Sequence, residues 1–165
     1  MEYSKARRHM MSGDVLMVKG RGVISSLIRA LTGESISHVA MILRMPKGVF
    51  VVEMKEFIGW RMMPASQWME KNKKKIVLWG KTPSHQRGAY CFESFAMLQR
   101  ARKYSYWTLL TIWFSQITRL KAPNNLVCST FVQKAWKNCG YDMGKQVADP
   151  GNFLEHAVDI VSIST

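Results

Sequence analysis

The sequence predicts an α+β domain in which a small antiparallel sheet packs on helices. In the first half of the chain, short apolar runs alternate with turns that contain Gly or Pro, which is typical of strands. After Pro83, apolar residues recur at helical spacing in longer segments. A chain of 165 residues is expected to form one hydrophobic core, so we interpret residues 1–165 as a single domain with a flexible basic N-terminal segment at residues 1–12.

The first half of the chain provides four of the predicted strands. Two of them flank Met45–Gly48, a turn that contains Pro46, and are expected to pair as a hairpin. The predicted strands are residues 14–19, 37–43, 49–54 and 76–79, and short helices are expected at residues 23–31 and 65–71.

The second half is predicted to contain two longer helices, at residues 87–103 and 128–139. The second is the better defined, because Cys128, Val132, Ala135 and Cys139 lie on one face and Gly140 follows as a helix stop. A closing strand is expected at residues 157–163. The aromatic run at residues 104–118 is shorter than the roughly 20 residues that span a bilayer, so we interpret it as core, with an interfacial helix as the alternative.

The charge and the cysteine count set the expected partners and redox state. Lys and Arg number 24 against 11 Asp and Glu, and the net charge of +13 predicts attraction to anionic partners. Three cysteines are too few for a disulfide scaffold, so we expect reduced thiols. The basic start of the chain has no apolar signal-peptide region, so synthesis and folding in the cytosol without a signal peptide are expected.

Cys128 is the candidate nucleophile. It lies in the first turn of the predicted helix, after Asn124 and Asn125, which are typical N-cap residues. The positive end of the helix dipole favours a thiolate over a thiol at this position. The alternative is a small buried residue, which is our interpretation of Cys139.

His38 and Glu53 are the candidate partners of this thiol. His38 opens an otherwise apolar strand, where an imidazole must be hydrogen-bonded or used in chemistry. If the hairpin loop holds an even number of residues, Arg44 faces Val49 and His38 lies diagonally across from Glu53 on one sheet face. The carboxylate would then fix the imidazole tautomer. The alternatives are a structural histidine and a Glu53 paired with a nearby lysine such as Lys55.

Together these motifs resemble the circularly permuted NlpC-type papain-like cysteine hydrolases, a group that includes the YiiX-like proteins and relatives of lecithin retinol acyltransferase. The resemblance extends from Gly13 to about Phe153, and the order His, acid, Cys is the permuted one. The matching segments are Gly13–Leu16 through Ile28, Ser37–Ala40, Val52–Glu53 and Cys128–Val132.

The resemblance implies a permuted papain-like fold and a specific chemistry. Cys128 would attack an acyl carbon to form an acyl-enzyme thioester, His38 would serve as base and then as acid, and Glu53 would orient His38. The backbone N–H of Cys128 is the expected oxyanion donor. The chain departs from the family in a basic, aromatic stretch between His38 and Cys128, so the substrate of the family is not transferred directly. The tryptophans concerned are Trp60, Trp68, Trp79, Trp107 and Trp113.

We predict an amidase or endopeptidase acting on peptidoglycan peptides, because unpermuted relatives cut such bonds and a basic protein would concentrate on an anionic cell wall. One alternative is a lipid acyl hydrolase or acyltransferase, with residues 104–114 on a membrane surface. Another is a basic binding or virion structural protein with an idle Cys128, which would bind nucleic acid through patches such as residues 71–75.

No cofactor or metal is expected, because the sequence contains no phosphate-binding glycine motif and no zinc-type Cys/His spacing. A short, basic chain without a signal suits a product of a phage or mobile element, associated with the virion.

Overall fold

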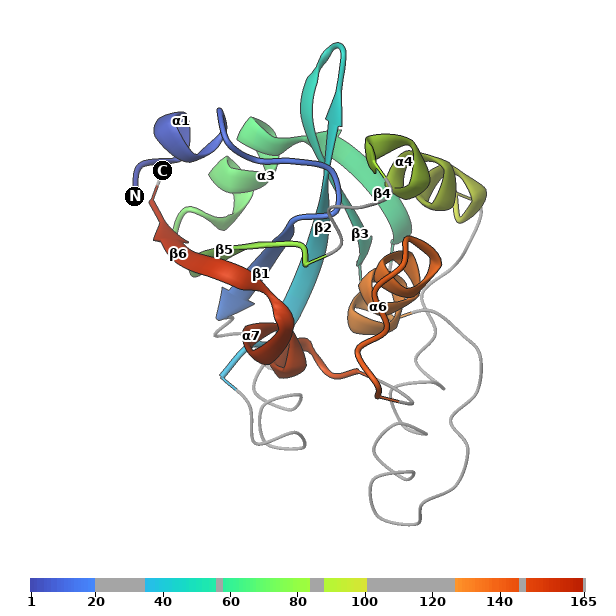
Figure 1. The fold of residues 1–165 in the computed structure, drawn as a ribbon. Coiled ribbons are helices and arrows are strands. Elements are labelled where there is room, and N and C mark those ends of the chain that lie inside the picture. Colours follow the sequence, from blue (N-terminus) through green and yellow to red (C-terminus); the bar gives the residue numbers. More distant parts are fainter. Residues whose placement is uncertain (20–34, 56–57, 84–87, 101–126, 146–147, 165) are drawn as a thin grey trace.

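The computed structural model describes residues 1–19, 35–55, 58–83, 88–100, 127–145 and 148–164. Their strands form a six-stranded antiparallel sheet in the order β4-β3-β2-β1-β5-β6 (Figure 1). The strands are β1 (Val15–Lys19), β2 (His38–Met45), β3 (Gly48–Lys55), β4 (Gly59–Pro64), β5 (Ile76–Lys81) and β6 (Val158–Ile163). With the helices that flank this sheet, the architecture is α+β, as predicted.

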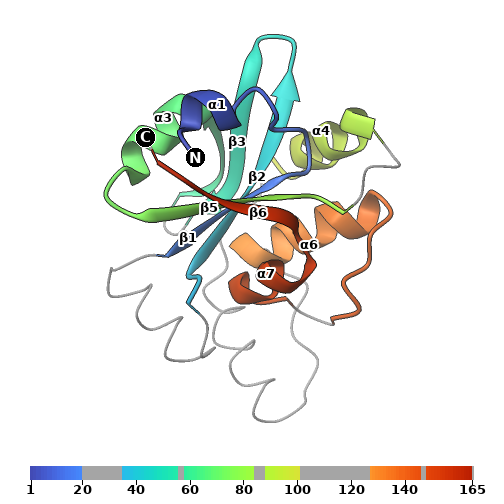
Figure 2. The ribbon, with the colours of Figure 1, turned by 60° about the vertical axis from the view of Figure 1, so that its left-hand side comes forward.

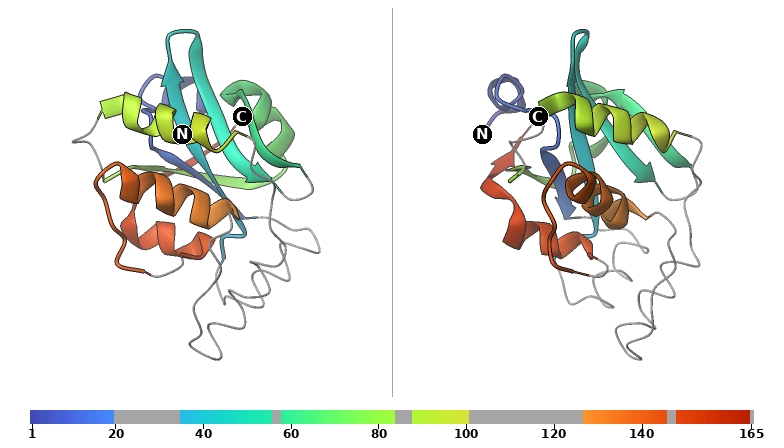
Figure 3. Two further views of the ribbon diagram at one scale, coloured as in Figure 1. Left: turned by 90° about the vertical axis from the view of Figure 1, so that its right-hand side faces the viewer. Right: turned by 45° about the vertical axis from the view of Figure 1, so that its right-hand side comes forward.

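Helices cover both faces of the sheet, as Figures 2 and 3 show. One face carries α1 (Tyr3–Ala6) and α3 (Ala65–Asn72), and the other carries α4 (Gly88–Leu98), α6 (Cys128–Asn138) and α7 (Phe153–His156). Side chains alternate between the faces along a strand. On β2, Val39 and Met41 therefore enter the core under α6, whereas Ala40 and Ile42 enter the core under α3.

The predicted elements agree with those of the structure to within a few residues, with β4 as the main omission. β4 begins at Gly59 and ends at Pro64, two residue types that are typical of turns, so the sequence does not indicate a strand there. A short 3-10 helix at Pro150–Asn152 precedes α7. The expected helix at residues 23–31 and the aromatic run at residues 104–118 lie outside the described residues. Within the described part, no helix is long and apolar enough to cross a membrane.

The N-terminal segment, predicted to be flexible, is packed against the body of the protein. Ala6 and Met10 are fully buried, and the amino group of Met1 donates to the Ser162 carbonyl at 2.7 Å. The Arg44 guanidinium donates from Nε to the carbonyl of Met10 at 2.6 Å. The segment is not flexible because its basic residues surround a few apolar side chains, and these side chains complete the core under α3.

The expectation of three reduced thiols is also corrected. Cys91 on α4 and Cys139 at the end of α6 form a disulfide, with 5.7 Å between their Cα atoms, and Cys128 is the free cysteine. The sequence could not reveal this pairing, because the two residues lie 48 positions apart and meet only when α4 packs beside α6. The disulfide links two helices that cover the same face of the sheet.

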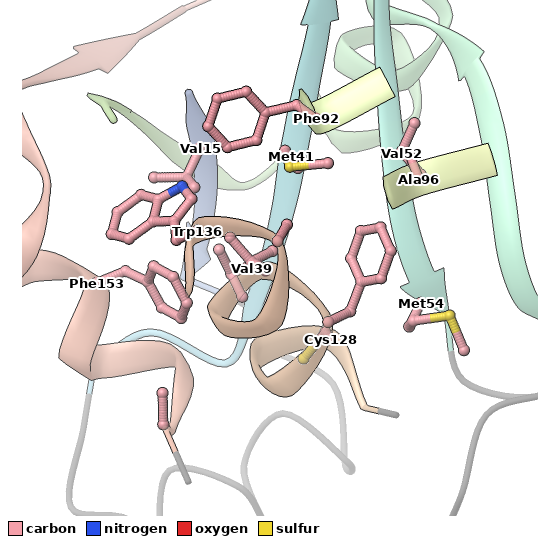
Figure 4. Close-up of a cluster of buried hydrophobic side chains, with 14 of the residues drawn as sticks. Val15, Val39, Met41, Val52, Met54, Phe92, Ala96, Cys128, Trp136 and Phe153 are labelled. Atoms are coloured by element: carbon pink, nitrogen blue, oxygen red, sulfur yellow. The ribbon is translucent and has the colours of Figure 1, made fainter. Parts of the chain in front are cut away.

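The position of α6 is fixed by contacts to the segment that precedes β1. The indole Nε1 of Trp136 donates to the Gly13 carbonyl at 2.8 Å, and the Trp136 ring packs edge-on against Phe153 (Figure 4). Gly13 has a φ of +93°, and a Cβ atom there would lie 2.5 Å from the ring of Phe92. Only glycine satisfies both the left-handed backbone and the close approach.

We expect Gly13→Ala to lower the free energy of unfolding by about 2–4 kcal/mol, because strain at positive φ adds to overpacking against Phe92. Gly144→Ala is the matched control, since Gly144 also has a positive φ (+67°) but an added Cβ would meet nothing within 4 Å. Urea unfolding of both variants measures the difference. Equal losses would show that Phe92 does not restrict this position.

Candidate active site

Cys128 is the first residue of α6 and is almost fully buried, with 2% of its surface exposed. The N-cap is Val127, whose N–H donates to the Thr130 hydroxyl at 2.9 Å. Asn124 and Asn125, the predicted capping residues, lie outside the described part of the chain. The backbone N–H groups in the first turn of a helix have no acceptor within the helix, and they form the positive end of the helix dipole. The sulfur therefore lies where a negative charge is favoured.

The β2–β3 hairpin has the even-loop register that the sequence analysis required. Arg44 pairs with Val49 and Met41 with Val52, which places Glu53 opposite Ala40 and diagonal to His38. The Nε2 atom of His38 lies 2.5 Å from Oε2 of Glu53, and both side chains are buried. The predicted contact between the imidazole and the carboxylate is thus present.

Arg61 completes the surroundings of Glu53 and was missed by the sequence analysis. It pairs directly with Glu53 across the β3–β4 ladder. Its Nε donates to Oε1 of Glu53 at 2.6 Å, and its Nη2 lies 2.5 Å from the same oxygen. Among the described residues, His38 and Arg61 contact Glu53, whereas the alternative considered from the sequence was a lysine such as Lys55. An opposite charge eight residues after Glu53, beyond a glycine turn, was the available signal.

The two charges at the centre of the site stabilise each other. Burial disfavours the imidazolium, but interactions with Glu53 and then with Cys128 outweigh this effect and raise the pKa of His38 to about 10. Burial likewise disfavours the Glu53 carboxylate, yet His38 and then Arg61 lower the pKa of Glu53 to about 2. At neutral pH the pair is an imidazolium and a carboxylate.

The second ring nitrogen of His38 is the one available to the thiol. Nε2 is engaged by Glu53, while Nδ1 is buried and makes no hydrogen bond within the described residues. Cys128 nevertheless lies close enough to the imidazole to raise the pKa of His38, both through its charge and through a weak side-chain hydrogen bond. Figure 4 shows Cys128 at the start of α6, toward the end of the sheet where β2 begins. Nucleophile–base contacts often tighten only when a substrate binds.

The comparisons with known proteins show the fold of this chain and no more. No family model matches it, and no curated protein resembles it in sequence. Its structure is similar to the crystal structure of the metalloprotein YiiX from Escherichia coli O157:H7, with a TM-score of 0.60 and 19% sequence identity. The similarity covers 82% of this chain and 70% of YiiX.

Because YiiX is described as a metalloprotein, we tested whether the residues present fit a metal ion. Among the described residues, no three His, Cys, Asp or Glu side chains are grouped to hold one. Both oxygens of Glu53 are already engaged, one by His38 and the other by Arg61. The described residues therefore do not fit a metal centre.

The shifted pKa values predict how this pair affects stability. The raised pKa of His38 stabilises the fold fully below its ordinary value of 6.5, and this effect is lost as the pH rises through about 10. The lowered pKa of Glu53 stabilises the fold above 4.5, and this effect is lost as the pH falls through about 2. Urea unfolding of the wild type and Glu53→Gln across pH 2–10 should show the largest difference between pH 4.5 and 6.5. Parallel pH profiles would contradict the ion pair.

Proposed function

We propose that the protein is a cysteine hydrolase with a permuted papain-like fold, in which Cys128 is the nucleophile, His38 the base and Glu53 the residue that orients the base. The observation that carries the proposal is the state of His38. One ring nitrogen is held by Glu53 at 2.5 Å, and the other is buried, has no hydrogen bond within the described residues and lies within electrostatic range of the free thiol. This is the arrangement that a nucleophile, a base and an orienting acid require.

The reaction begins from an ion pair between the Cys128 thiolate and the His38 imidazolium, whose Nδ1 carries the proton. The thiolate attacks the carbonyl carbon of an amide, and the carbonyl electron pair moves to the oxygen. When the C–N bond breaks, His38 donates its proton to the leaving amine, and a thioester to Cys128 remains. His38 then removes a proton from a water molecule that attacks the thioester, and the Cys128 sulfur leaves as a thiolate beside the His38 imidazolium. The products are an amine, a carboxylic acid and the original enzyme.

The protein contributes positioning and electrostatic stabilisation to these steps. Glu53 holds the ring through Nε2, so Nδ1 stays directed to the nucleophile. The N–H of Cys128, at the start of α6, is the donor we assign to the developing oxyanion. Because Trp136 fixes α6 to the Gly13 carbonyl, the nucleophile and this donor keep their place relative to the sheet.

The substrate we propose is the amide bond of peptidoglycan peptides, on an anionic cell wall. In addition to the net charge of +13, the structure supports this choice through the lysine turn, which we define as Lys73–Lys75. Ile76 pairs with Lys19, and Val18 pairs with His38, so the lysine turn lies at the same end of the sheet as His38. Two strand spacings separate β2 from β5, which is about 10 Å. Positive charge there would attract an acidic polymer to the site.

Alkylation tests the nucleophile. Iodoacetamide should modify Cys128 in the folded protein at pH 7, whereas Cys91 and Cys139 are protected by their disulfide. An ordinary thiol is only about 3% ionised at this pH, so His38→Ala should slow the reaction by about 10- to 30-fold. Glu53→Gln should slow it less, because the acid acts on the histidine. Mass spectrometry gives the rates.

His156→Ala is the matched control for these variants, because His156 also makes a side-chain hydrogen bond, 2.9 Å to Tyr141, but lies on α7. It should leave the rate unchanged. If His38→Ala and His156→Ala react with iodoacetamide at the wild-type rate, His38 is not the base and the proposed function is wrong.

Binding to murein sacculi tests the substrate class and the role of the lysine turn. We expect binding to weaken as salt rises, since screened contacts dominate it. Lys73, Lys74 and Lys75 all changed to Gln should weaken hydrolysis and binding more than the same change at Arg7, Arg8 and Lys47. Both sets are exposed and remove three charges, but the second lies around the β2–β3 turn at the opposite end of the sheet.

Equal effects of the two triple variants would mean that only net charge matters. Retention on anionic liposomes at high salt, without retention on sacculi, would replace the cell-wall substrate by a lipid. Lysine-dependent DNA binding without any hydrolysis would favour a binding protein with an idle cysteine.

A further inference from the structure

Arg61 contacts the orienting carboxylate of Glu53, but the steps of the proposed reaction assign it no role. Glu53 is buried, with 2% of its side chain exposed, and its two oxygens have different partners. Oε2 contacts Nε2 of His38. Oε1 contacts two nitrogen atoms of Arg61, Nε at 2.6 Å and Nη2 at 2.5 Å. Two contacts from a planar guanidinium restrict the rotation of the carboxylate more than a single ammonium could.

The charges of the site balance only when Arg61 is counted. In the reactive state, the Cys128 thiolate and the Glu53 carboxylate are negative, and the His38 imidazolium is positive. These three groups alone would leave one uncompensated negative charge at buried residues, which is costly. The Arg61 guanidinium brings the sum to zero. Without Arg61, protonation of the Cys128 thiolate is the simplest way to remove the excess negative charge.

We propose that Arg61 is a positioning residue of this site: its guanidinium fixes the Glu53 carboxylate against His38 and supplies the positive charge that lets Cys128 remain a thiolate. The inference rests on the proposed function, because it concerns the same thiol and the same imidazole. It assigns to β4, the edge strand that follows β3, a direct part in preparing the nucleophile.

The groups that act on Glu53 come from three elements. His38 reaches it from β2, Arg61 from β4, and the Trp68 indole approaches it from α3. Of these, only His38 and Arg61 carry a charge, and only Arg61 keeps its charge at every pH used in an enzyme assay. A change at Arg61 therefore alters the charge balance without altering the base itself.

The test is the pH dependence of Cys128 alkylation by iodoacetamide in the full chain, compared between the wild type, Arg61→Lys and Arg61→Met. In Arg61→Met, the midpoint of the profile should move to higher pH by about one unit, so the rate below both midpoints falls roughly tenfold. Arg61→Lys should keep a midpoint near that of the wild type, because it keeps the charge. Its rate at the plateau should be unchanged, since alkylation needs only the thiolate.

Arg44→Met is the matched control. Arg44 lies on β2 and donates to the backbone carbonyls of Met10 and Arg7, so its loss should reduce thermal stability without moving the midpoint. Thermal unfolding is recorded for every variant, and Arg61→Gln serves as a second neutral variant should Arg61→Met unfold.

The outcomes separate this inference from the proposed function. A wild-type midpoint at the ordinary thiol value of about 8.5, unaffected by His38→Ala, would overturn the proposed function. If the midpoint of the alkylation profile lies below the ordinary thiol value in the wild type and is the same in Arg61→Met, only the proposed role of Arg61 is overturned. If both neutral variants unfold, or if Arg61→Lys shifts the midpoint as much as Arg61→Met, Arg61 is a structural residue and the proposal is wrong.

Discussion

The buried carboxylate of Glu53 is the constraint on which the central part of the sheet depends. A carboxylate that leaves water loses several kcal/mol of hydration unless nearby cations and hydrogen bonds compensate for it. Glu53 finds these partners on the strands at either side, His38 on β2 and Arg61 on β4. A slip of either ladder by one residue would turn these side chains to the other face and leave the charge unpaired. The ion pairs and the strand registers therefore support one another.

The helix layer that contains Cys128 is fixed independently of these charges. Trp136 anchors α6 to the Gly13 carbonyl, and the disulfide between Cys91 and Cys139 joins its far end to α4. Asp14, the next residue along the chain, accepts hydrogen bonds from the Trp79 indole and from the backbone N–H of Thr82. The segment that leads into β1 thus connects the sheet to α6.

The similarity to YiiX, at 19% identity, demonstrates how little sequence is needed to keep this architecture. Fold and chemistry are separate questions, because one fold supports many sites. The chemistry proposed for this chain rests on the buried imidazole of His38, the Glu53 carboxylate beside it, the Arg61 guanidinium that pairs with this carboxylate, and the thiol at a helix start. These features belong to the described residues and do not depend on what YiiX does.

Local patterns were sufficient to predict much of this protein. Alternating apolar residues and turn chemistry located β1, β2 and β3, and helical spacing with Gly140 defined α6 and its starting cysteine. The same periodicity, with an even loop, predicted that His38 would reach Glu53, because the register of a hairpin follows from its turn. Each of these inferences needed only residues that are close in sequence or joined by a short turn.

Other features were decided only when distant segments met. Arg61 acquired its partner because β4 pairs with β3, and a lone arginine between Gly59 and Pro64 does not indicate a strand. Cys91 and Cys139 form a disulfide because α4 packs beside α6, and the basic N-terminal segment is ordered because Ala6 and Met10 fill a core built by later strands and α3. In each case the stabilising partner is supplied by packing, so no local pattern in the chain could have specified it.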